Sequence, residues 1–150
     1  MSTVFKSEAS RQAILAAFEL LLDQWPVRAT SRLVDTRPGG GFVVCFGAPE
    51  AAPLVLLPGT GSNLAAWAGD APTLAARFHV HAIDLPGEPG MSCETRLPLD
   101  GPLHSEWLAE ILDTMGVEKT AIAGISLGAF LAMRFAIDCP RRVTALAMLC

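Results

Sequence analysis

Ser126 stands at the centre of the segment "GISLG", between a run of small apolar residues and a second apolar run. The first run, residues 119–125, predicts a buried strand, and the second, residues 127–138, predicts a helix. A serine at such a junction occupies a sharp, strained turn that presents its hydroxyl at the carboxyl edge of a sheet. Strand and helix then approach so closely that only small residues fit two positions away, where Gly124 and Gly128 stand. The pattern predicts a nucleophile at Ser126.

A second glycine turn follows another apolar run. Residues 54–58, "LVLLP", are typical of a strand buried on both faces, and Gly59 and Thr60 come directly after it. Ligands gather at the carboxyl edge of an α/β sheet. We therefore expect the backbone N–H groups of Thr60 and Leu127 to donate hydrogen bonds to an oxyanion. A plain strand-to-helix turn would also favour glycine, but its combination with the serine turn favours the catalytic interpretation.

The elements that must position these residues begin with a helix and a hairpin. Residues 7–24 open with serine caps and then repeat apolar residues at helical spacing, before Pro26 stops the run. This predicts an amphipathic helix whose apolar side carries Ile14, Phe18, Leu21, Leu22 and Trp25. The stretches 31–36 and 42–47 flank the turn "RPGGG" and predict a β-hairpin.

Strand–helix units follow the hairpin. A helix suggested by Leu64, Trp67 and Leu74 can be capped by Ser62 or Asn63 and is weakened or split by Pro72. Further strands are expected at 79–85 and 142–150, and a helix whose apolar face starts at Trp107 ends at Gly116. This order predicts an α/β protein with a mostly parallel sheet, helices on both faces and right-handed crossovers.

The chain resembles the α/β-hydrolase superfamily. The hairpin, "LVLLPGTGSN", "AIDLPGEPGMS" and "AGISLGAFLAMRFAIDCPRRVTALAML" fall in that family's order and spacing, from about Leu33 onward. The segments "QWPV" and "DLPGEPGMS" are similar to a group of bacterial carboxylesterase-like hydrolases. The resemblance implies a nucleophilic Ser126, oxyanion amides at Thr60 and Leu127, and a strand-end turn at residues 84–86, Asp-Leu-Pro. Pro58-Gly59 stands where the family usually has His-Gly. That histidine mostly shapes the loop, so the departure affects the geometry of the loop more than the chemistry.

The residues that would activate the serine are missing after it. A serine hydroxyl needs a general base, and in this family the acid and then the histidine follow the nucleophile in the chain. The 24 residues after Ser126 contain one carboxylate, Asp138, which is expected at the surface end of a helix, and no histidine. His79 and His81 lie at the start of their strand and should point toward the opposite edge. His104 could approach the serine only by abandoning the family arrangement.

We therefore expect residues 1–26 to form an N-terminal amphipathic helix and residues 27–150 the N-terminal part of a single hydrolase domain, with the acid, base and lid beyond Cys150. The apolar last strand would leave an edge that natural domains avoid, so the 150 residues alone should be poorly soluble or oligomeric and without turnover. The alternative is a catalytically inactive hydrolase-fold protein with a binding or regulatory role. A nucleotide site is disfavoured because neither glycine turn fits a phosphate-binding pattern.

The composition of the chain limits which other classes of protein and partner are expected. The chain is 51% apolar, 17% charged and carries a net charge of −4 with no Lys/Arg cluster, so we expect a globular domain that does not bind nucleic acid. No signal peptide or membrane-spanning run is expected, and the cytoplasm is the expected location. The dispersed cysteines predict free thiols (Cys45, Cys93, Cys139 and Cys150). We expect a small-molecule ester substrate and no cofactor, metal or membrane partner; the oligomeric state stays open.

Overall fold

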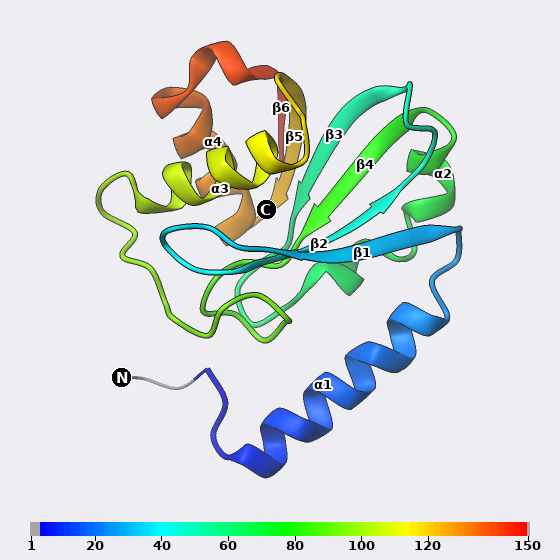
Figure 1. Ribbon diagram of the computed structural model, residues 1–150, viewed down its shortest axis with the longest axis vertical. Helices are drawn as coiled ribbons and strands as arrows, with labels where there is room; N and C mark the ends of the chain where they lie inside the picture. The colour runs from blue at the N-terminus through cyan, green and yellow to red at the C-terminus, as the bar shows by residue number, and fades with distance from the viewer. Residues whose placement is uncertain (1–3, 150) are drawn as a thin grey trace.

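The computed structural model describes residues 4–149, so Cys150 lies outside the described residues. Its centre is a six-stranded sheet in the order β1-β2-β4-β3-β5-β6 (Figure 1). β1 pairs antiparallel with β2 and β2 with β4, whereas the pairs that join β4, β3, β5 and β6 are parallel. The predicted hairpin followed by a mostly parallel sheet is confirmed. The strands are β1 Ala29–Val34, β2 Gly41–Phe46, β3 Ala52–Leu57, β4 Phe78–Ile83, β5 Thr120–Ile125 and β6 Val143–Leu149.

Helices cover both faces of the sheet, as predicted. The α-helices are α1 Glu8–Asp23, α2 Ala71–Ala75, α3 Leu103–Thr114 and α4 Leu127–Asp138, and the short 3₁₀ turns are η1 Leu64–Trp67 and η2 Pro140–Arg142. α3 and α4 pack together on one face, while α1 lies across the sheet from them (Figure 1).

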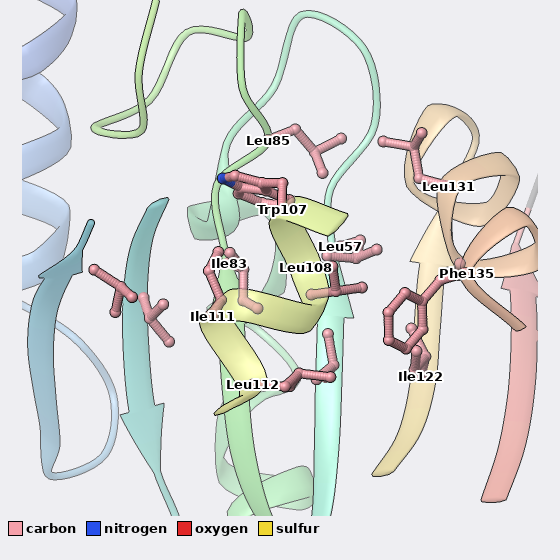
Figure 2. Close-up of a cluster of buried hydrophobic side chains, with 14 of the residues drawn as sticks. Leu57, Ile83, Leu85, Trp107, Leu108, Ile111, Leu112, Ile122, Leu131 and Phe135 are labelled. Atoms are coloured by element: carbon pink, nitrogen blue, oxygen red, sulfur yellow. The ribbon is translucent and has the colours of Figure 1, made fainter. Parts of the chain in front are cut away.

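Two apolar cores result because successive strand residues alternate between the faces. Figure 2 shows the core beneath α3 and α4, where Trp107 and Ile111 of α3 and Phe135 of α4 meet strand residues such as Leu57 and Ile83. The second core joins Phe18 of α1 and the η1–α2 region to the other face, and its buried members include Leu64, Trp67, Phe42, Val80 and Leu56. Both cores hold the carboxyl ends of β3, β4 and β5 in fixed relative positions.

The N-terminal helix begins at the predicted cap but buries less than its spacing suggests. Ser7 and Ser10 form a reciprocal capping box. Phe18 is fully buried and meets the Phe42 ring edge-on at 6.2 Å, but Ile14 is 39% and Leu21 50% exposed. Leu22 and Trp25 pack beside Phe18 against the second core, whereas Ile14 and Leu21 of the predicted apolar side face solvent.

The sequence left two candidates, Ser62 and Asn63, for the cap of the helical segment after β3, and the structure shows that Asn63 is the cap. The Asn63 side chain accepts a hydrogen bond from the Ala65 N–H at 3.1 Å and caps η1. Pro72 stands in the first turn of α2, so the suggested helix is divided into η1 and α2. The predicted stop at Gly116 is confirmed, since Gly116 follows α3 with φ +72°, a conformation that glycine adopts without strain.

β6 is the outer strand of the sheet on the side of the serine turn. Within residues 4–149 it pairs with β5 alone. Its residues from Thr144 to Leu149 are exposed, including Leu146 at 39% and Met148 at 51%. The strand therefore presents both unpaired backbone groups and apolar side chains.

Candidate active site

Ser126 adopts a backbone conformation that side-chain-bearing residues avoid. It lies between β5 and α4 with φ 50° and ψ −110°, and among residues 4–149 it is the one non-glycine residue with positive φ. Its N–H donates to the Leu149 carbonyl of β6 at 2.8 Å, and its carbonyl accepts from the Phe130 N–H of α4 at 3.0 Å. Strand and helix thus hold the strained turn from both sides, and the residue itself is exposed.

The two flanking glycines are required by close backbone contacts. A Cβ on Gly124 would lie 2.3 Å from the carbonyl carbon and oxygen of Gly128. A Cβ on Gly128 would lie 2.4 Å from the Leu57 carbonyl oxygen and 2.5 Å from that of Pro58. Rigid backbone atoms, not flexible side chains, fill the space, so no larger residue fits at either position.

The loop after β3 lies directly against this turn. A Cβ placed on Gly59 would be 3.6 Å from the Ser126 Cβ and 3.4 Å from the Ile125 carbonyl oxygen. Thr60 follows Gly59, and Leu127 follows Ser126. Both Thr60 and Leu127 line one small pocket of about 120 Å³. The residues named as oxyanion donors therefore lie at a common cavity next to the serine; its other lining residues are Pro86, Glu88, Arg96, Leu97, Leu99 and His104.

Asp84, which directly follows β4, fixes the loop that follows β3. Its side chain is 1% exposed, and its two carboxylate oxygens accept hydrogen bonds from the Leu64 N–H at 2.7 Å and the Met91 N–H at 2.8 Å. Burial raises the pKa of Asp84 to about 6, and the two backbone hydrogen bonds act against that rise. Asp84 thereby joins the segment after β3 to the segment after β4.

Glu88 makes a second connection between the same segments. It is 4% exposed; Oε2 accepts from the Gly61 N–H at 2.6 Å, and Oε1 lies 3.3 Å from Nη2 of Arg96. The Asn63 amide nitrogen adds a hydrogen bond to the Pro89 carbonyl at 3.0 Å. Sequence reasoning gave Glu88 no role, because its backbone partner is 27 residues away and only the folded chain brings them together.

The histidines lie at two different places. His104 of α3 is buried and lines the pocket that contains Thr60; its Nε2 is 3.3 Å from the Leu97 carbonyl oxygen, and burial lowers its pKa. His79 and His81 are the second and fourth residues of β4, with ring centroids 4.5 Å apart. His81 lies against Cys45 at 3.4 Å, and burial, with a smaller effect of His79, lowers its pKa to about 4. His79 lies at the start of the strand, as predicted, whereas His81 lies in its middle, three residues before Asp84.

Asp138 is the last residue of α4, a twelve-residue helix that begins next to the serine. Its carboxylate accepts a hydrogen bond from Ser105 Oγ at 2.6 Å and pairs with Arg134 at 3.0 Å. These two interactions lower the pKa of Asp138. Asp138 is thus the helix-end residue that the sequence predicts. Its carboxylate oxygens are engaged by Ser105 of α3 and Arg134 of α4.

Neither a metal-binding cluster nor a membrane-spanning helix is found in the described part of the chain. No group of three or more His, Cys, Asp or Glu side chains in it is arranged to hold a metal ion. None of its helices is long and apolar enough to cross a membrane. Cys45, Cys93 and Cys139 are free thiols, as predicted.

The model of the alpha/beta hydrolase fold family matches residues 52–150, which include the loop after β3, the Asp84 turn and the serine turn. The chain belongs to the α/β-hydrolase family. The carboxylesterase YbfK of Bacillus subtilis (strain 168) is 28% identical over 147 residues, which are 95% of this chain and 48% of that protein. The uncharacterized carboxylesterase nap of the same organism is 31% identical over 128 residues, 85% of this chain and 43% of that protein.

Solved structures of this family resemble the chain closely. The crystal structure of the carboxylesterase CesB (YbfK) from B. subtilis matches with a TM-score of 0.84 and 26% identity, over 91% of this chain and 48% of the other. The crystal structure of the naproxen esterase (carboxylesterase NP) from B. subtilis matches with a TM-score of 0.82 and 28% identity, over 95% of this chain and 50% of the other. The α/β-hydrolase chain described here spans half the length, or slightly less, of these relatives.

Proposed function

We propose that the chain carries the nucleophile half of a serine hydrolase that cleaves ester-type bonds, with Ser126 as the attacking residue. The observation that carries the proposal is the positive φ of Ser126 at a strand–helix junction whose glycines admit no side chain. Backbone strain of this kind persists where the surrounding structure enforces it, and it concentrates at functional sites. The carboxylesterase names of the relatives agree with this chemistry.

In the proposed reaction, Ser126 Oγ attacks the ester carbonyl and forms a tetrahedral intermediate. The N–H groups of Thr60 and Leu127 donate to its oxyanion, and they belong to residues that line the same pocket. Collapse expels the alcohol and leaves an acyl-enzyme, which water then hydrolyses. The substrate is a small-molecule ester, and the reaction needs no cofactor.

The proton transfers require a base and an acid that we place outside residues 1–150. No histidine follows Ser126 in these residues, and Asp138 is engaged by Ser105 and Arg134. We therefore propose that residues 27–150 are the N-terminal part of one hydrolase domain, that residues 1–26 precede it, and that the acid and histidine come from a following segment. The relatives, which are about twice as long, support this division.

The competing proposal is a hydrolase-fold protein that binds ligands without turnover. It is favoured by one fact, that residues 1–150 hold no histidine after the serine. An intact serine turn argues against it, because the strain at Ser126 stabilises nothing in the fold.

Labelling by a fluorophosphonate separates the two proposals. The protein that contains these residues should be labelled at Ser126, and Ser126→Ala should abolish the label. Ser62→Ala, at a serine of the neighbouring loop, is the matched control and should leave labelling intact. Hydrolysis of p-nitrophenyl acetate should follow the same pattern; a wild-type protein that is folded, unlabelled and inactive would support the binding role.

A further inference from the structure

Glu88 occupies an unusual position for a carboxylate. It is 4% exposed and lines the pocket that also contains Thr60 and Leu127. A negative charge beside a developing oxyanion opposes its formation, and a buried charge is costly unless it is paired. The Glu88 charge therefore needs a compensating interaction if the pocket is to stabilise an anion.

Both carboxylate oxygens of Glu88 are in use. Oε2 accepts from the Gly61 N–H at 2.6 Å, which is short for an N–H···O bond and fits a charged acceptor. Oε1 pairs with Arg96, whose Nη2 also donates to the Gly87 carbonyl at 3.1 Å. Arg96 is 62% exposed along its side chain, so the ion pair runs from the pocket wall to its mouth.

The hydrogen bond to Gly61 acts on the peptide next to Thr60. Gly61 has φ +69° and is exposed, and a Cβ at this position would meet nothing within 4 Å, so no neighbouring atoms press on this side of the loop. Asp84 holds Leu64, three residues further on. Glu88 is thus the side chain that fixes the loop nearest to the Thr60 N–H.

We propose that Glu88 is a positioning residue, which aims the Thr60 N–H through Gly61, and that Arg96 neutralises its charge so that the pocket can hold an oxyanion. This inference rests on the proposed function of the Ser126 site. Its physical basis is that an oxyanion donor stabilises the transition state only when it is held in place beforehand.

The test uses the active protein that contains these residues and measures kcat and KM for p-nitrophenyl acetate. In Glu88→Ala we expect kcat to fall about 10- to 100-fold while KM changes less than about threefold, because the lost alignment matters in the transition state. Glu88→Gln keeps an oxygen that can accept from Gly61 and should retain kcat within about fivefold of the wild type. Glu94→Ala, which removes the acid that pairs with Arg11, is the matched control and should leave both constants unchanged.

Arg96→Met separates positioning from a merely structural role. It leaves the Glu88 carboxylate uncompensated, so kcat should fall about tenfold. Adding Glu88→Gln to Arg96→Met should restore kcat toward that of Glu88→Gln alone, because the uncompensated carboxylate charge is then absent. A role in folding alone predicts instead that kcat per folded molecule is unchanged in all three variants and that only the free energy of unfolding differs.

The outcomes are distinguishable. A folded wild type that neither turns over nor labels at Ser126 overturns the proposed function, and this inference with it. An active wild type whose Glu88→Ala variant keeps kcat within twofold overturns the role of Glu88 alone. If Glu88→Ala does not fold, Glu88→Gln and the double variant still decide, since failure of Glu88→Gln to lessen the Arg96→Met defect refutes the charge argument.

Discussion

Gly128 faces the carbonyl oxygen of Leu57 so closely that a Cβ on the glycine would lie 2.4 Å from that oxygen. The first turn of α4 therefore rests on the backbone at the end of β3. This contact brings the serine turn and the loop that begins at Gly59 to one place.

Replacing either flanking glycine should destabilise the fold strongly. In Gly124→Ala and Gly128→Ala the added methyl group meets backbone atoms, so relief requires a shift of α4 against the sheet. We expect a loss of about 3 kcal/mol in the free energy of unfolding, measured by urea denaturation. Gly69→Ala is the control, because a Cβ there meets nothing within 4 Å; a loss in it as large as in Gly128→Ala would refute the explanation.

Ser126→Gly should make the protein more stable while destroying its reactivity. Glycine adopts positive φ without the steric cost that a Cβ imposes, so removing the side chain should raise the free energy of unfolding by about 1 kcal/mol. Ser126→Ala keeps the Cβ and should show little gain, although it loses the hydroxyl equally. Thermal unfolding of the three proteins measures this; equal melting temperatures for the two variants would contradict the stored strain.

The interior position of His81 should make stability depend on pH. Burial lowers its pKa to about 4 from an ordinary 6.5, so between these values the unfolded chain binds a proton that the folded chain excludes. The stabilising contribution is complete above pH 6.5 and is lost as the pH falls toward 4, by at most about 3 kcal/mol. His81→Leu should flatten this part of the stability curve. Parallel curves for wild type and variant would refute the effect.

Asp84 should act in the opposite direction over nearly the same pH range. Its pKa is raised from 3.8 to about 6, so the folded chain takes up a proton before the unfolded chain does. Relative to Asp84→Asn, the wild type should therefore gain stability as the pH falls from 6 to 3.8. At pH 7 the variant should still be less stable by about 1–3 kcal/mol, because its amide group faces two N–H donors and can accept from one. Urea unfolding across this pH range measures both effects.

Local sequence patterns predicted the elements and the sharp strand–helix turn at Ser126 well. The "GISLG" turn, the buried run 54–58 and the stop at Gly116 depend on neighbouring residues, whose spacing shows in the chain itself. The exposure of Leu21 could not be predicted, because helical spacing identifies an apolar side but not how much of that side meets the sheet. The roles of Asp84 and Glu88 also stayed hidden, since each binds a backbone group 20 or 27 residues away.

The mutual contact of the two glycine turns also bears on how this site can change in evolution. A Cβ on Gly128 would collide with the backbone of Leu57 and Pro58, just before Gly59, so a substitution at Gly128 displaces the loop that lies against Ser126. A single change at Gly128 should disrupt the site, and a tolerated change there should need a compensating one across the contact. The two turns therefore form one epistatic unit. Leu99 lines the pocket, is half exposed and lies outside that contact, so in the proposed hydrolase a new substrate preference would be reached more readily there.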